Sequence, residues 1–198
     1  AYLLFYFISI LIPSEYADLV NSLPTCFPTD TVYINVDKDA VRRSGMFIPY
    51  DSIPDRMVIS LKGQNELYKS FVMMLEMMAQ INFSRPMYMS TTVGSQHYGS
   101  LYRHFLQEGI AYRITPFTFS QNSDPRLIEA VDTDKMYENM MNKYSYGNMK
   151  QEGVYIDETT MRMCYTHRRW FSVLISKLVE EGKYDLMIVD PPAFAKHR

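Results

Sequence analysis

The sequence contains few cysteines and no excess of charge of either sign. Its two cysteines, Cys26 and Cys164, stand far apart and outside any Cys-x-x-Cys spacing, so they predict neither a structural zinc site nor a disulfide framework. A single bridge between them could form in an oxidising compartment, because geometry and not number decides pairing. The formal net charge is −2, so no basic surface attracts phosphate groups and nucleic acid is a disfavoured partner.

The sequence also lacks a hydrophobic run long enough to cross a bilayer. Its most apolar stretch is residues 1–12 (AYLLFYFISILI), which stop at Pro13. A membrane helix needs about 20 apolar residues, and the stretch has neither the basic leader nor the small-residue cleavage site of a signal peptide. Two interpretations stay open: a buried element of a soluble domain, or the end of a membrane span whose start lies outside this chain.

Patterns that would indicate catalysis or metal binding are incomplete. Asp132, Thr133 and Asp134 form a D-x-D pattern, which can hold a divalent cation, but their place before a helix favours capping. His97 and His104 lack an acidic third ligand, so no zinc site is expected. We therefore expect no catalytic residue, no metal site and no cofactor in this chain.

Methionine and tyrosine are abundant, with 15 and 16 residues among 198. Thioether side chains fill irregular cores, and tyrosine rings pack while their hydroxyl groups stay wet. The favoured interpretation is therefore a methionine-rich core. The length suits one ordinary domain or two small ones.

Periodicity in the first half predicts strands and helices in turn. Residues 31–36 alternate as a half-buried strand, and residues 57–61 form a second one. Between them, Asp37 opens a turn or short helix that ends near Gly45. A longer helix is predicted over residues 66–81, with one apolar face formed by Leu67, Phe71, Leu75, Met78 and Ala79.

The next stretch turns a sharp corner. Pro86 fixes its own φ and pushes Arg85 out of the helical region, so the preceding helix must end by Ser84. Tyr88 and residues 91–93 then favour a strand. A second helix is expected over residues 101–107 with Gly109 as its C-terminal cap, followed by extended residues 111–119.

The second half reads as helical after a polar boundary at residues 121–125. Asp132 or Thr133 caps a helix that runs to about Tyr144, with Gly147 closing it and with Met136, Met140 and Met141 facing inward. A longer helix starts at residues 157–160 and ends at Gly182, with an apolar stripe formed by Cys164, Phe171, Leu174, Ile175 and Leu178.

Four blocks of the chain carry a family resemblance. Residues 82–88 (NFSRPMY), 106–113 (LQEGIAYR), 131–143 (VDTDKMYENMMNK) and 154–162 (VYIDETTMR) resemble the soluble C-terminal region of a family of bacterial membrane proteins. That family is related to the protein O-mannosyltransferases, multi-pass glycosyltransferases that use lipid-linked sugars. The similarity covers residues 27–183 and departs at Phe83, where the family usually carries tryptophan.

The resemblance implies a function for the chain as part of a larger protein. In the family the catalytic carboxylate lies between membrane spans, so this chain would be a non-catalytic domain on the periplasmic or extracytoplasmic face. Its expected partners are the membrane-embedded portion of the same protein and an acceptor polypeptide that it positions. The candidate binding residues inside the blocks are Arg85, Tyr88, Glu108 and Arg113. A competing interpretation is that Arg85 and Glu108 pair with each other or bind backbone carbonyls.

The last segment resembles a different family. Residues 184–189 (YDLMIV) read as a strand, and the residues after it resemble the D-P-P-x-F loop of methyltransferases that use S-adenosylmethionine. The loop residues that would act there are Asp190, Pro191, Pro192 and Phe194. No Gly-rich cofactor turn follows any predicted strand. Because of the loop resemblance, a nucleic-acid methyltransferase fragment is kept as the alternative function. A purely structural interaction module is a third.

Together these patterns predict an α+β fold, with a small mixed sheet and packed helices followed by a tetratricopeptide-like helical part. Residues 1–25 are an unassigned apolar segment, the possible end of a membrane span. Residues 26–120 form the α+β domain and residues 126–183 the helical part. Residues 184–198 are a strand and a D-P-P-A-F loop of uncertain origin.

Overall fold

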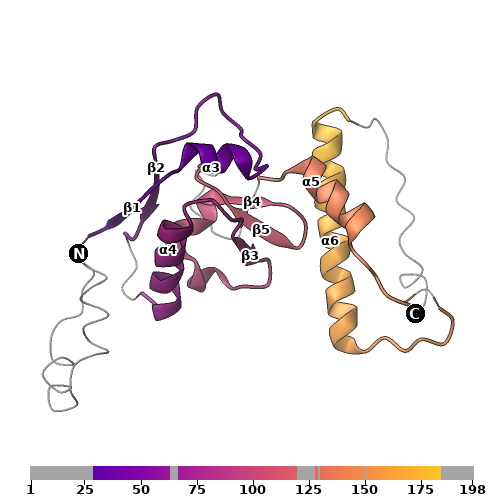
Figure 1. The fold of residues 1–198 in the computed structure, drawn as a ribbon. Coiled ribbons are helices and arrows are strands. Elements are labelled where there is room, and N and C mark those ends of the chain that lie inside the picture. The colour runs from indigo at the N-terminus through magenta and orange to yellow at the C-terminus, as the bar shows by residue number, and fades with distance from the viewer. Residues whose placement is uncertain (1–28, 63–66, 120–127, 129, 150, 184–198) are drawn as a thin grey trace, which may run out of the picture. The chain divides into compact units, whose positions relative to one another are not determined.

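The computed structural model describes residues 29–62, 67–119, 128, 130–149 and 151–183 (Figure 1). The predicted segments 1–25 and 184–198 and the predicted boundary at residues 121–125 lie outside these residues. No helix in the described part of the chain is both long and apolar enough to span a membrane. The elements, in order, are β1 (Thr31–Asn35), α3 (Lys38–Arg43), β2 (Arg56–Ser60), α4 (Lys69–Ile81), β3 (Tyr88–Ser90), η2 (Ser95–His97), η3 (Gly99–His104), β4 (Phe105–Gln107), β5 (Ala111–Ile114), α5 (Thr133–Tyr137), η4 (Glu138–Lys143) and α6 (Glu158–Glu180).

Strands β1 and β2 form an antiparallel pair in which Tyr33 lies opposite Val58. The predicted alternation is confirmed, since Ile34 is buried while Tyr33 is 61% exposed. The predicted turn at Asp37 is also confirmed, because its carboxylate accepts the backbone N–H groups of Asp39 and Ala40 at 2.9 and 3.0 Å and so caps α3.

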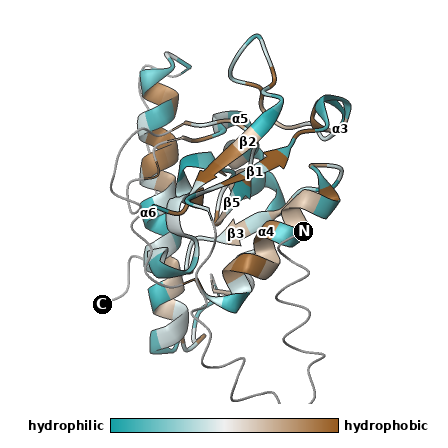
Figure 2. Cartoon of the chain, turned by 90° about the vertical axis from the view of Figure 1, so that its left-hand side faces the viewer, coloured by the Kyte–Doolittle hydropathy of each residue, from teal (hydrophilic) through white to brown (hydrophobic). Residues whose placement is uncertain are grey.

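Helix α4 buries Phe71, Leu75 and Met78, as its spacing predicts, but Ala79 at the border of this stripe is exposed. Figure 2 shows hydrophobic residues along α4 and along both strands of the β1–β2 pair. The helix ends at Ile81, before the predicted limit at Ser84, because Asn82 and Phe83 adopt left-handed φ values of 46° and 62°. The corner is therefore made first by these two residues, and burial of the Phe83 ring in the core holds a backbone conformation that is costly for phenylalanine.

The second sheet has the order β3-β5-β4 and is antiparallel throughout. The expected single mixed sheet is thus wrong: the described strands form two antiparallel sheets, and their parallel contact is an isolated bridge between Gln107 and Val131. Residues 91–93 form a turn after β3, where a longer strand was predicted.

The helix expected over residues 101–107 is wrong for its last three residues. A 3-10 helix, η3, ends at His104 and the chain continues as strand β4. Phe105 and Leu106 are each 1% exposed, and pairing with β5 buries both faces of this short apolar run, which overrides its local helical spacing. Gly109, with φ 128°, accordingly lies in the connection from β4 to β5 and caps no helix.

The helical half begins at the predicted cap. The Asp132 carboxylate accepts the Lys135 N–H at 2.9 Å and starts α5, which continues as the π-helix η4 and ends before Tyr144. Met136 and Met140 are fully buried, whereas Met141 is 54% exposed, so the predicted inward position of Met141 is wrong. Adjacent residues on a helix point in different directions, and only one of the pair can face the core.

Helix α6 starts at the predicted Asp157 and packs against α5. It buries Cys164, Leu174 and Leu178, but its largest buried side chain, Trp170, is missing from the predicted stripe, in which Phe171 and Ile175 are only partly buried. Gly182, with φ 67°, follows the helix end as predicted. The tetratricopeptide-like array stays a prediction.

One hydrophobic core joins the sheets to the helices. Phe105 stacks on Tyr112 with ring centroids 5.4 Å apart, and Tyr112 meets Trp170 edge-on at 6.4 Å. This aromatic series links β4, β5 and α6, so residues of the predicted segments 26–120 and 126–183 share buried surface.

We expect the cap of α6 to weaken in acid. Hydrogen bonds from the Thr160 N–H and hydroxyl hold the pKa of Asp157 below its ordinary value of 3.8. A lowered folded-state pKa stabilises the fold above the unfolded-state pKa, and this contribution is lost as the pH falls through the folded-state pKa. Circular dichroism during acid titration of the parent should show loss of helix signal. In Asp157→Asn, which caps the helix without a charge, this loss should occur at a different pH or disappear. An identical acid profile in the variant would contradict this assignment.

Candidate functional site

Three of the four predicted binding residues meet on one face of the second sheet. Tyr88 on β3 lies directly opposite Arg113 on β5, and Arg113 lies opposite Leu106 on β4. Glu108 follows Leu106 by two residues, so it emerges on the same side of the sheet. Strand register therefore brings together side chains that are up to 25 positions apart in the sequence.

The Glu108 carboxylate is the centre of this cluster. Its Oε2 accepts the Tyr88 hydroxyl at 2.7 Å, and its Oε1 lies 3.4 Å from Nη1 of Arg113. The guanidinium also donates from Nη2 to the Ser44 carbonyl at 3.0 Å, which attaches the end of α3 to the sheet. Asn139 of η4 donates to the Glu108 carbonyl at 2.7 Å. The cluster thus connects elements from both halves of the chain.

Burial sets the electrostatics of the cluster. The side chains of Arg113 and Glu108 are 3% and 4% exposed, so their charges are largely desolvated and depend on each other. Burial, followed by the hydrogen bond to Glu108, raises the pKa of Tyr88 to about 12, so the phenol stays a donor at neutral pH. Burial also raises the pKa of the nearby Asp132 carboxyl group, with a smaller contribution from the negative charge of Glu108.

Arg85 does not belong to this cluster. It is exposed and makes no hydrogen bond or ion pair with any residue that the structure describes. The alternative pairing of Arg85 with Glu108 is therefore wrong, because Arg113 on the adjacent strand takes that position. Arg113 and Glu108 are occupied by internal contacts, whereas Arg85 and the half-exposed Tyr88 ring are accessible to a partner.

A second surface feature is the outer edge of β1. Val36 donates to the Asp55 carbonyl at 2.9 Å, and the antiparallel register then directs the backbone groups of Tyr33 and Asn35 away from β2. Within the described ranges these outward N–H and C=O groups have no hydrogen-bond partner. Both side chains are exposed as well. The edge of β1 can therefore pair with another extended chain.

The opposite edge of this sheet is covered. Nε2 of His104 lies 3.1 Å from the Val58 carbonyl of β2, and the Ser60 carbonyl accepts from the Ser100 hydroxyl. Nδ1 of His104 lies 2.9 Å from the Phe117 carbonyl, so this buried ring joins β2 to the segment after β5. Burial chiefly lowers the pKa of His104. The role is structural and does not involve His97, whose ring lies beside Tyr68.

The open edge of β1 leads to the corner that carries Arg85. The backbone N–H of Asp37, two residues beyond β1, donates to Oδ1 of Asn82 at 2.9 Å. Arg85 follows Asn82 by three residues, a chain length of about 10 Å at most. Sequence reasoning identified Arg85 but missed this edge, because alternation indicates a strand and does not reveal which of its sides is paired.

The D-x-D pattern and the methyltransferase-like loop are the two remaining sites that the sequence suggested. Asp132 of the D-x-D pattern caps α5, and Asp134 forms an ion pair with Lys183 at 2.7 Å, so neither carboxylate is free. No group of three or more His, Cys, Asp or Glu side chains gathers as metal ligands among the residues described. The methyltransferase-like loop residues Asp190, Pro191, Pro192 and Phe194 lie outside the described part of the chain.

Comparison with protein families gave one match. The model of a family described as TMEM260-associated domain 2 matches residues 13–135, which is more than half of the chain. The matched range contains both sheets, the corner at Arg85 and the Glu108 cluster. Comparisons with curated proteins and with solved structures gave no match.

Proposed function

Because the chain belongs to the TMEM260-associated domain 2 family, which is associated with a glycosyltransferase-like membrane protein, we propose that it is a non-catalytic domain that positions an acceptor polypeptide. The sugar transfer itself would take place in the membrane-embedded portion of the same protein. The domain would lie on the extracytoplasmic face, where it presents an extended segment of the acceptor to that portion.

The observation that carries this proposal is the open edge of β1. An extended polypeptide can add a strand to such an edge, and backbone hydrogen bonds then supply affinity that depends little on sequence. That property suits a domain that must hold different acceptors. The exposed side chain of Tyr33 on β1 would contact a residue of the added strand.

Arg85 would add a charged contact at one end of the edge. Its guanidinium is free to form two parallel hydrogen bonds with a carboxylate of the acceptor. The hydrogen bond between Asp37 and Asn82 attaches its corner to the end of β1. The Glu108 cluster supports this arrangement from within, because Arg113 binds the carbonyl of Ser44 just after α3.

Proline at an outward-facing position of β1 tests the proposal. In the full-length membrane protein, Asn35→Pro removes one outward N–H group, and proline is tolerated on an edge strand. Losing the hydrogen bond that this N–H would donate should raise the KM for acceptor about 5- to 10-fold. Binding of the lipid-linked sugar should stay unchanged. Transfer kinetics in membranes would measure both.

The matched control is Arg56→Pro, at the position directly opposite Asn35 on β2. Its backbone points toward the other side of the pair, so we expect the acceptor KM of this variant to stay close to that of the parent. Deleting the whole domain should lower acceptor transfer and preserve sugar binding. If Asn35→Pro and the deletion both left acceptor transfer intact, the proposed function would be wrong.

A further inference from the structure

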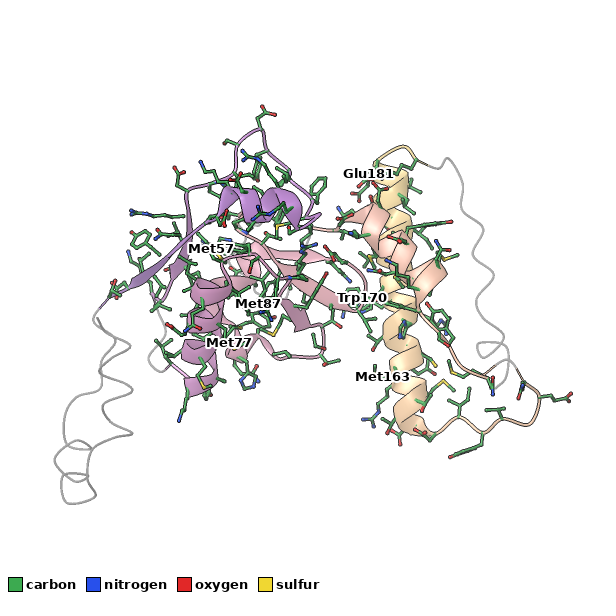
Figure 3. The ribbon with its side chains drawn as sticks, viewed as in Figure 1. Met57, Met77, Met87, Met163, Trp170 and Glu181 are labelled. Atoms are coloured by element: carbon green, nitrogen blue, oxygen red, sulfur yellow. The ribbon has the colours of Figure 1, made fainter. Side chains whose placement is uncertain are left out.

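A pocket of about 310 Å³ lies between α6 and the segment that follows η4. Its lining includes four side chains that carry sulfur or nitrogen: Met149, Met163, Cys164 and His167. Figure 3 shows Met163 on α6, well separated along the helix from Trp170. The pocket lies in none of the contacts proposed above for the acceptor.

Helical spacing and one loop contact bring these side chains together. Cys164 and His167 are three residues apart on α6, which places their Cβ atoms about 5–6 Å apart on one face. Met149 reaches them from the loop, and its Sδ lies 3.8 Å from Sγ of Cys164. Two sulfur ligands of one tetrahedral ion, each about 2.3 Å from it, are themselves about 3.8 Å apart.

His167, which also lines the pocket, has a ring nitrogen that makes no hydrogen bond in the described residues. Its Nδ1 is buried and has no hydrogen-bond partner among the described residues. The rings of Tyr144 and Tyr146 meet the imidazole edge-on with centroids 6.2 and 5.6 Å away, so the orientation of the ring is fixed by packing. An imidazole nitrogen that is desolvated without a partner is costly unless something binds it.

We propose that Met149, Cys164 and His167 form a binding site for a soft monovalent cation, Cu(I). Thiolate, thioether and imidazole are the ligands that Cu(I) selects, and the pocket lining includes no carboxylate that a hard cation would require. Met163, which is 45% exposed, stands at the pocket as an additional thioether. On binding, the thiol proton of Cys164 leaves to solvent and the copper stays in the reduced state in which it arrives.

Ordinary core packing is the competing explanation for the sulfur contact, since methionine and cysteine both fill apolar interiors. Two observations distinguish a site from packing. The residues line a pocket instead of a filled core, and Nδ1 of His167 has no hydrogen-bond partner among the described residues. Sequence reasoning missed the site because methionine was not considered as a ligand, and Met149 lies 15 residues from Cys164.

Anaerobic titration of the chain with Cu(I), in competition with a chromophoric Cu(I) chelator, tests the proposal. Parent and variants would all carry Cys26→Ser, so that Cys164 is the single thiol. We expect one equivalent of Cu(I) to bind, with sulfur neighbours at about 2.3 Å in X-ray absorption spectra. Met149→Leu keeps the volume of the side chain and should weaken binding at least about 10-fold, and Cys164→Ser should weaken it more.

Met73→Leu, an exposed methionine on α4, is the matched control and should leave affinity unchanged. Circular dichroism confirms that each variant is folded. Equal affinity in the parent and in Met149→Leu, or no stoichiometric binding to the parent, would overturn the assignment. Binding of Zn(II) as tight as that of Cu(I) would overturn the choice of a soft cation. None of these outcomes bears on acceptor transfer.

Discussion

Replacing Glu108 with alanine is expected to lower the free energy of unfolding by about 3–5 kcal/mol, because the change leaves the guanidinium of Arg113 buried without its counter-ion. Arg113 is 3% exposed at its side chain and cannot regain water without opening the sheet. The Tyr88 hydroxyl would lose its acceptor at the same time. Denaturant titration followed by circular dichroism would measure the loss, which is a large fraction of the stability of a typical domain.

Two variants separate this effect from a general effect of removing a charge. Glu108→Gln keeps an acceptor for the Tyr88 hydroxyl and should be less destabilising than alanine. Glu138→Ala breaks an exposed ion pair with Lys143 and should be much less destabilising than Glu108→Ala. If Glu108→Ala cost no more than this surface control, the buried pair would not hold the sheet together.

Trp170→Ala is expected to cost about 3–5 kcal/mol, the usual range for removing a large buried aromatic side chain. Trp170 is 7% exposed and packs edge-on against Tyr112, so its loss leaves a cavity between α6 and the β3-β5-β4 sheet. Because the core is continuous, the whole described unit should unfold in one transition at lower denaturant concentration. Circular dichroism at helix and aromatic wavelengths would follow both parts.

Tyr165→Ala on the exposed side of the same helix is the control, since Tyr165 is 58% exposed and its removal should change stability by no more than about 0.5 kcal/mol. Loss of helix signal in Trp170→Ala while the aromatic signal persists would show that α6 unfolds independently. That outcome would contradict a core shared by the helix and the sheet.

Local patterns predicted the elements whose determinants lie within a few residues. Asp37, Asp132 and Asp157 were recognisable as helix caps, because a short acidic side chain satisfies free N–H groups two or three residues further on. The alternation in β1 and the apolar face of α4 were recognisable for the same reason. The exposure of Ala79 could not be predicted in this way, because a small residue at the border of an apolar stripe is buried only if a neighbour covers it.

Long-range pairing decided the features that periodicity misjudged. Residues 105–107 read as the end of a helix, yet they form β4, because burial between β5 and the core outweighs a weak local preference. The corner at Arg85 shows the same division. Pro86 predicts that the preceding helix must end. The left-handed residues Asn82 and Phe83 end it earlier, and burial of the Phe83 ring stabilises that conformation.

Local sequence patterns were sufficient to predict an α+β chain with capped helices and a half-buried first strand, and the family resemblance suggested four candidate binding residues. Three features follow from the tertiary structure alone: Glu108 pairs with Arg113 and not with Arg85, Met149 meets Cys164, and the outer edge of β1 has no partner strand among the described residues. The physical reason is the distance along the chain between the residues that determine each feature. Caps and amphipathic faces depend on spacing along the chain, whereas ion pairs, strand edges and pockets depend on which distant segments the core brings together.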